Sequence, residues 1–85
     1  MWKVTETKQA AKELSKLPKR VTLIYRILVE DLEREGPRPK GWDILLLKGR
    51  PEIRIKLIRE YRVLLRVEAP NLIVIKVAHR KEVYK

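Results

Sequence analysis

Six basic side chains in the second half of the sequence recur at a spacing that suits nucleic-acid chemistry. They are Arg54, Lys56, Arg62, Arg66, Lys76 and Arg80. Each lies in one of three apolar stretches, 53–57, 61–67 and 72–80, that read as β-strands in series. Side chains alternate between the two faces of a strand, so these strands would carry the cations on one common face. A sheet face of this kind attracts a polyanion.

The opposite face of the same strands is predicted to form the core of the domain. Its expected members are Ile53, Ile55, Leu57, Val63, Leu65, Val67, Ile73, Ile75 and Val77. The other apolar residues of the strands are expected between the cations, and they are Leu64, Leu72, Val74 and Ala78. Apolar surface between charged groups is a mixture on which bases and riboses can pack.

A basic sheet face also has a simpler explanation, because one face of an antiparallel sheet is often in contact with water alone. A solvated face usually mixes both signs of charge, since directly opposed like charges cost roughly a few tenths to 1 kcal/mol per pair. Here the nearest carboxylates, Glu60 and Glu68, fall at the strand ends. The pattern therefore favours a functional basic surface over solvation alone.

The composition restricts the chemistry further. The 85 residues suffice for one domain, 1–85, and include no cysteine and one histidine, so we expect no disulfide, metal site or cofactor. The net charge is +10, and 48–85 hold most of it, with 11 basic against 4 acidic side chains. This distribution predicts attraction to nucleic acid or to an acidic protein. We expect a cytoplasmic protein that does not bind membranes, because no apolar run approaches the ~20 residues of a span and the amino terminus lacks a signal-peptide core.

Helix and strand signals in the first half complete the expected architecture. The expected elements are a strand at 2–4, a helix capped by Thr5 and ending near residue 16, a helix at 19–35, a loop at 36–42 and a strand at 44–48. Pro18 separates the two helices, and Gly36 with Pro37 stops the second. The sequence thus predicts an α+β domain, in which an antiparallel sheet carries an N-terminal helical hairpin on one face.

The basic set could cleave RNA without a metal ion. That reaction needs a base for the ribose 2′-hydroxyl, cationic donors around the phosphorane and help for the departing 5′-oxygen. Arginine stays cationic and binds phosphate oxygens through two N–H groups, which suits Arg54, Arg62 and Arg80 to the phosphate. Lys56 is the candidate base, and Tyr84 could stack on a nucleobase or simply pack as a hydrophobic cap.

Short motifs follow one another over nearly the whole chain. They are Ala11-Lys12-Glu13-Leu14, Lys16-Leu17-Pro18, Leu47-Lys48-Gly49, Arg54-Ile55-Lys56, Tyr61-Arg62-Val63, His79-Arg80 and Val83-Tyr84. In this order and spacing they resemble the RelE/ParE superfamily of toxin-antitoxin toxins, in its RelE-like branch. The resemblance implies a fold with the order β-α-α-β-β-β. It also implies a ribosome-dependent messenger RNA endoribonuclease that inhibits translation and is neutralised by a cognate antitoxin.

The resemblance implies a role for each residue of the basic set that matches a family motif. Lys56 matches the residue held to act as base, and Arg54 the residue that binds or stabilises the phosphate. Arg62 matches an arginine that stabilises the transition state. Arg80 matches one assigned to stabilisation or to protonation of the leaving group. Tyr84 matches a tyrosine that stacks on or orients the substrate.

Three further residues are candidate RNA- or phosphate-binding groups, namely Arg66, Lys76 and His79. His79, beside Arg80, could be a general acid or an ordinary turn histidine. The sequence also departs from the family pattern. Arg59-Glu60 precedes the Tyr-Arg motif where a glycine is common, which predicts a different hairpin turn, and Arg54 replaces a lysine.

Two other functions remain open at the level of sequence. A ParE-like toxin would poison DNA gyrase through protein contacts and would not need the basic set. A catalytically silent domain would bind only RNA or antitoxin. For the favoured function we expect two partners, the ribosome with its messenger RNA and an acidic, partly disordered antitoxin in a hetero-oligomer with the toxin.

Overall fold

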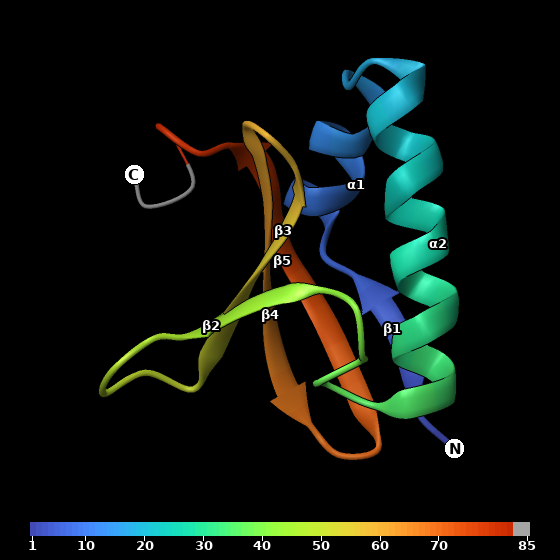
Figure 1. Cartoon of the computed structure of the whole chain (residues 1–85), viewed down its shortest axis with the longest axis vertical. Coiled ribbons are helices and arrows are strands. Elements are labelled where there is room, and N and C mark those ends of the chain that lie inside the picture. The colour runs from blue at the N-terminus through green and yellow to red at the C-terminus, as the bar shows by residue number, and fades with distance from the viewer. Residues whose placement is uncertain (83–85) are drawn as a thin grey trace.

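The structure, a computed structural model, describes residues 1–82 as an α+β domain. Its elements are β1 (Lys3–Glu6), α1 (Lys8–Ser15), α2 (Lys19–Glu35), β2 (Asp43–Leu46), β3 (Glu52–Ile58), β4 (Tyr61–Glu68) and β5 (Asn71–His79) (Figure 1). The strands form one five-stranded sheet in the order β1-β5-β4-β3-β2. The predicted fold class is therefore confirmed.

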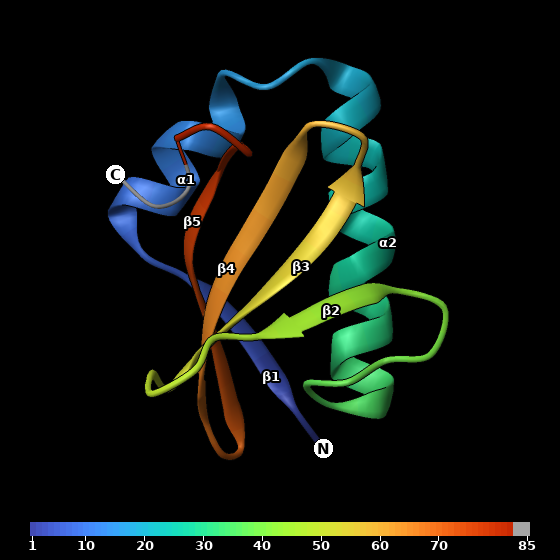
Figure 2. The same ribbon diagram turned by 60° about the vertical axis from the view of Figure 1, so that its left-hand side comes forward.

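Two details of the expected topology are wrong. β1 runs parallel to β5, so the sheet is mixed rather than antiparallel throughout. A parallel pair needs a long connection, and here nearly the whole chain separates the two strands. Four strands follow the helices, as the hydrophobic pattern indicated, whereas the order β-α-α-β-β-β has three. The additional strand is the short edge strand β2, which crosses in front of α2 in Figure 2.

The first helix begins later than its predicted cap. Thr7, rather than Thr5, caps α1, because its hydroxyl accepts a hydrogen bond from the Ala10 backbone N–H at 3.1 Å. Thr5 is instead part of β1 and pairs with Ile73 of β5. Pairing with β5 keeps the chain extended through Glu6, so the helix cap lies two residues later than predicted.

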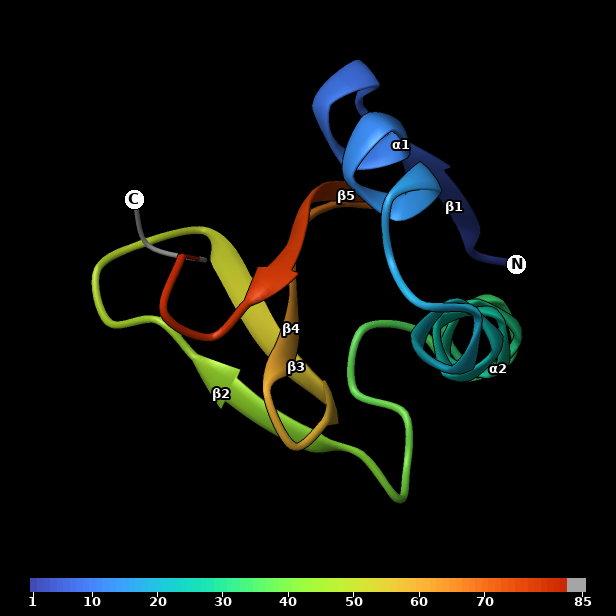
Figure 3. The same ribbon diagram turned by 90° about the horizontal axis from the view of Figure 1, so that it is seen from above.

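Both helices pack on the same face of the sheet, as Figures 1 and 3 show. α2 buries Val21, Tyr25, Leu28 and Leu32, whose spacing of four, three and four residues forms one stripe along the helix. We call the sheet face beneath the helices the inner face and the opposite face the outer face. The predicted core positions of β3 and β4 lie on the inner face, and Ile55, Val63 and Leu65 are fully buried.

On β5 the predicted alternation holds for only part of the strand. Leu64 pairs with Lys76 while Leu65 pairs with Val74, so Ile75 is an extra residue in a β-bulge. The bulge shifts the alternation by one. Leu72 and Val74 therefore join the core, and the prediction that Ile73 and Ile75 would do so is wrong. The remaining predicted member of the core on this strand, Val77, is buried as expected.

Two glycines test the packing of the amino terminus against the end of α2. Gly36 and Gly41 both have φ +88°, a positive φ that strains an alanine by roughly 1–3 kcal/mol. A Cβ on Gly36 would also lie 2.8 Å from Nε1 of Trp2, whereas one on Gly41 meets nothing within 4 Å. We expect Gly36→Ala to lower the free energy of unfolding in urea by about 1 kcal/mol more than Gly41→Ala. Equal losses would show that Trp2 is not held against Gly36.

Candidate nucleic-acid interface

Strand register places four of the six predicted cations in two neighbouring rows of the outer face. In the first row Lys56 of β3, Arg62 of β4 and Ala78 of β5 are paired side by side. In the second row Arg54, Leu64 and Lys76 are paired in the same way. We call Arg54, Lys56, Arg62 and Lys76 the basic cluster. Leu64 and Ala78 lie between its members but are almost fully buried, with 6% and 8% exposed.

The cluster concentrates like charge. Lys56 and Arg62 are directly opposed across the β3–β4 pair, an arrangement that costs stability unless an anion relieves it. On its other side Lys56 is paired in register with Asp43 of β2, a carboxylate whose proximity the sequence pattern did not indicate. The two rows therefore bring four cations together on the outer face, with Asp43 paired to Lys56 at the β2 edge.

Arg62 differs from the rest of the cluster because its side chain is buried, with 8% of the residue exposed. One terminal nitrogen, Nη1, donates hydrogen bonds to the backbone carbonyls of Ile58, Arg59 and Tyr61 at 3.0–3.3 Å. These carbonyls lie at the end of β3, in the loop between β3 and β4, and at the start of β4. Arg62, the middle member of the first row, thus holds this loop, and in return its guanidinium is fixed in place.

Arg80 reaches the same loop through its backbone. Its N–H donates to the carbonyl of Glu60 at 2.5 Å, immediately after the end of β5. Residues 80–82 then turn toward the side of the sheet away from the helices (Figures 1 and 3). Arg80 is exposed. The loop between β3 and β4 therefore lies beside both predicted arginines, Arg62 through its side chain and Arg80 through its backbone.

His79 does not lie with the basic cluster. It is paired with Tyr61, one position out of phase with the Arg62–Ala78 pair, so its side chain belongs to the opposite side of the sheet. Its ring contacts Tyr61 edge-on, with centroids 5.9 Å apart. Nδ1 accepts from the Lys81 backbone N–H at 3.2 Å, and Nε2 lies 3.3 Å from a Glu60 carboxylate oxygen. The neutral tautomer with its proton on Nε2 satisfies both contacts.

Arg66 lies on the outer face in a third row, but acidic groups surround it. It is paired with Glu52, whose carboxylate is 3.5 Å from Arg66 Nη2, and Glu68 lies 3.8 Å from Nη1. Glu52 is buried, and the sequence interpretation did not include it among the nearby carboxylates. The signal was present, because Glu52 precedes Arg54 by two residues and therefore shares its face.

The remaining predictions concern Tyr84, metal binding and membrane-spanning segments. Tyr84 lies outside the described residues. Within residues 1–82, no group of three or more His, Asp or Glu side chains is arranged to hold a metal ion. In the same part of the chain, neither helix is long and apolar enough to cross a membrane.

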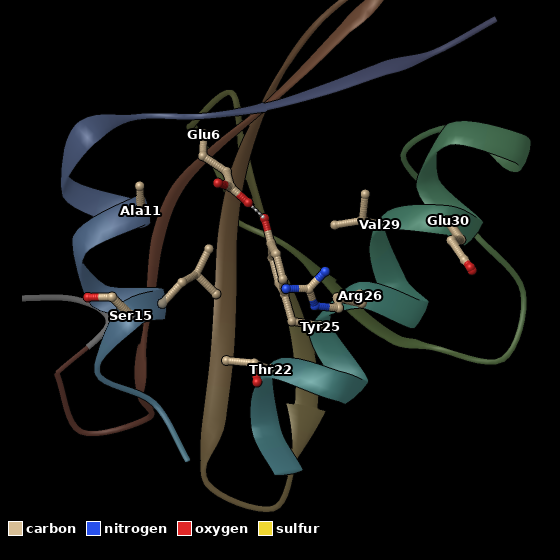
Figure 4. A pocket seen from close by; sticks show the side chains of 9 residues that line it. Glu6, Ala11, Ser15, Thr22, Tyr25, Arg26, Val29 and Glu30 are labelled. Carbon is tan, nitrogen blue, oxygen red and sulfur yellow. Dashed lines mark hydrogen bonds between the residues drawn. The ribbon is translucent and has the colours of Figure 1, made fainter. Parts of the chain in front are cut away.

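The molecule also has a groove on its other side, between α1 and α2. Its volume is about 750 Å³, and Leu14, Tyr25 and Val29 contribute to its lining (Figure 4). The Tyr25 hydroxyl donates to the Glu6 carboxylate at 2.5 Å. Burial, together with this bond and the charge of Glu6, raises the pKa of Tyr25 well above its usual range. All residues that line the groove belong to β1, α1 or α2, so the groove is separate from the outer face and does not contain the basic cluster.

Comparison with solved structures identifies the fold. The archaeal RelE-RelB complex from Pyrococcus horikoshii OT3 contains a chain that is 26% identical, with a TM-score of 0.81 over 95% of this chain and 97% of that one. The RelB-RelE antitoxin-toxin complex from Methanococcus jannaschii gives 24% identity and 0.81 over 93% of each chain. The YoeB dimer from Staphylococcus aureus gives 14% and 0.78 over 92% of this chain and 95% of that one.

No protein-family model matches the sequence, and no curated protein matches it. The similarity is therefore visible in three dimensions where the sequences have diverged. The chain has the RelE-like toxin fold that its motifs indicated.

The contacts of Arg62 predict that it stabilises the fold, whatever else it does. Arg62→Ala removes the charge-assisted hydrogen bonds that the two N–H groups of Nη1 share among three backbone carbonyls, so we expect the free energy of unfolding to fall by about 2–3 kcal/mol. Lys56→Ala, a control on the same face, should change it by no more than about 0.5 kcal/mol. Urea unfolding of the two variants measures the difference. Equal stability of the variants would mean that the loop does not depend on Arg62.

Proposed function

We propose that this chain, which has the RelE-like toxin fold, is the toxin of a toxin-antitoxin system and an endoribonuclease that cleaves messenger RNA on the ribosome. The observation that carries the proposal is the basic cluster, in which cations from three strands lie in two adjacent rows of the outer face. Cations supply the groups that phosphodiester transesterification requires, and the reaction needs no metal ion.

The proposed reaction starts with Lys56 as the base that takes the proton of the ribose 2′-hydroxyl. The 2′-oxygen attacks the adjacent phosphorus, and the bond to the 5′-oxygen breaks. Arg54 and Arg62 stabilise the charge on the phosphorane. The departing 5′-oxygen takes up a proton from water, and Arg80, which stays cationic, stabilises the charge on that oxygen. The products are a 2′,3′-cyclic phosphate and a free 5′-hydroxyl.

The geometry of Arg62 supports its part in this reaction. Its guanidinium is already held by the loop between β3 and β4, so little reorganisation is needed when charge develops on the phosphate. Its partner in the row, Lys56, is directly across the strand pair, within the reach of one ribose-phosphate unit. Lys76, in the adjacent row, is proposed to bind the phosphate of the neighbouring nucleotide. Tyr84 is proposed to stack on a base.

The partners follow from charge and from the similar structures. The P. horikoshii and M. jannaschii toxin chains were solved with RelB, and a YoeB chain of S. aureus was solved with YefM. For this chain we propose a cognate antitoxin that is acidic, because a net charge of +10 favours an oppositely charged partner. Because translation takes place in the cytoplasm, we propose that the protein acts there.

A catalytically silent RNA- or antitoxin-binding domain is the second candidate, and the burial of Arg62 favours it. An arginine that a loop needs can persist without catalysis. The gyrase-poison alternative has no such support, because a gyrase poison would not require the basic cluster.

Primer extension on messenger RNA from cells that express the chain separates these functions. Cuts within translated codons are expected for the nuclease. Intact messages with trapped gyrase–DNA complexes would identify a gyrase poison, and intact messages with normal gyrase would leave only the silent domain.

The proposed roles also predict the kinetics of variants on purified ribosomes. Lys56→Ala and Arg80→Ala should each lower the cleavage rate by about 100-fold or more, the usual effect of losing one catalytic group. Ribosome affinity should change little, because one phosphate contact among many is a small part of binding. Lys12→Ala, on the exposed side of α1, removes the same charge and should cleave at the wild-type rate. Cleavage at the wild-type rate by both Lys56→Ala and Arg80→Ala would refute the proposed site.

A further inference from the structure

The third row of the outer face contains a buried carboxylate, Glu52, between two arginines. Only 7% of Glu52 is exposed, although it is the first residue of β3, where the sheet meets a surface turn. Arg50 Nε donates to one of its oxygens at 3.0 Å, and Arg66 Nη2 lies 3.5 Å from the other. Each carboxylate oxygen therefore has its own guanidinium.

These contacts limit what Arg50 and Arg66 can bind. A carboxylate removed from water interacts strongly with the cations beside it, because solvent screens the pair less than it would on an open surface. Glu68 adds a weaker contact with Arg66 at 3.8 Å. The charge of the third row is therefore compensated from within the protein.

We infer that Glu52 sets one boundary of the RNA-binding surface and thereby positions the scissile linkage. It keeps Arg50 and Arg66 from binding phosphate, so the RNA backbone is held only by the basic cluster and its neighbours. Glu52 contacts no RNA and acts through the two arginines, as a positioning residue. The inference rests on the proposed function, since it requires that the outer face binds RNA.

Binding of single-stranded RNA as a function of salt tests this boundary directly. A 2′-O-methylated oligonucleotide, which cannot be cleaved by 2′-oxygen attack, is the probe. Each phosphate contact contributes about 0.7 to the slope of log affinity against log salt. Glu52→Gln should steepen the slope by about 0.7–1.4 and tighten binding at low salt by about threefold or more, as one or both arginines engage phosphates. Glu33→Gln, an exposed position on α2, adds the same net charge and should leave the slope at the wild-type value.

Variants of Arg66 provide a second test, which does not require that Glu52→Gln folds. In the otherwise wild-type protein, Arg66→Gln should alter the slope by less than about 0.2, whereas Lys56→Gln should lower it by about 0.7. In the Glu52→Gln background, Arg66→Gln should remove about half or more of the increase in slope that Glu52→Gln causes. An Arg66→Gln loss as large as that of Lys56→Gln would overturn the inference, and so would identical slopes for folded Glu52→Gln and Glu33→Gln.

The same measurements separate failure of the boundary from failure of the proposed function. If Lys56→Gln and Arg66→Gln both leave the wild-type slope unchanged, the outer face does not bind RNA and both proposals fall. If Lys56→Gln lowers the slope as expected but Glu52→Gln leaves it unchanged, only the boundary is wrong.

Discussion

Burial of a single sheet face beneath two helices is the constraint on which the rest of this structure depends. Because the inner face must be apolar, the charged residues of β3, β4 and β5 are left on the outer face. Strand pairing then converts three separate sequence positions into one row, as in Lys56, Arg62 and Ala78. The functional surface is thus a consequence of the same alternation that forms the core.

The basic residues predicted for the outer face differ in their contacts, and these contacts show which of them belong to the basic cluster. Arg62 is fixed by loop carbonyls, Arg66 is compensated by a buried carboxylate, and His79 is turned to the other side of the sheet. What remains is a small cluster at the end of the sheet where the loop between β3 and β4 meets the beginning of the 80–82 segment. Under the proposed function, this cluster would bind one or two nucleotides of a single strand.

Much of this organisation could be predicted from period-two and helical patterns. The α2 helix, the inner faces of β3 and β4 and the common face of Arg54, Lys56 and Arg62 follow from spacing alone. The bulge at Ile75 could not be read, because both phases of β5 are apolar. The cap was misplaced because Thr5 and Thr7 both suit that role and only pairing with β5 decides between them. The burial of Arg62 depends on carbonyls that no sequence pattern reveals.

The central claim is that the basic cluster promotes attack by a ribose 2′-oxygen on its own phosphate. The most direct measurement uses a messenger RNA with a single 2′-deoxyribose on the 5′ side of an established cut, positioned in a programmed ribosome with the purified chain. The account predicts that cleavage at that linkage is lost, and that the all-ribose message yields a 2′,3′-cyclic phosphate. Cleavage of the deoxy-substituted linkage, or products ending in a 3′-hydroxyl, would contradict it.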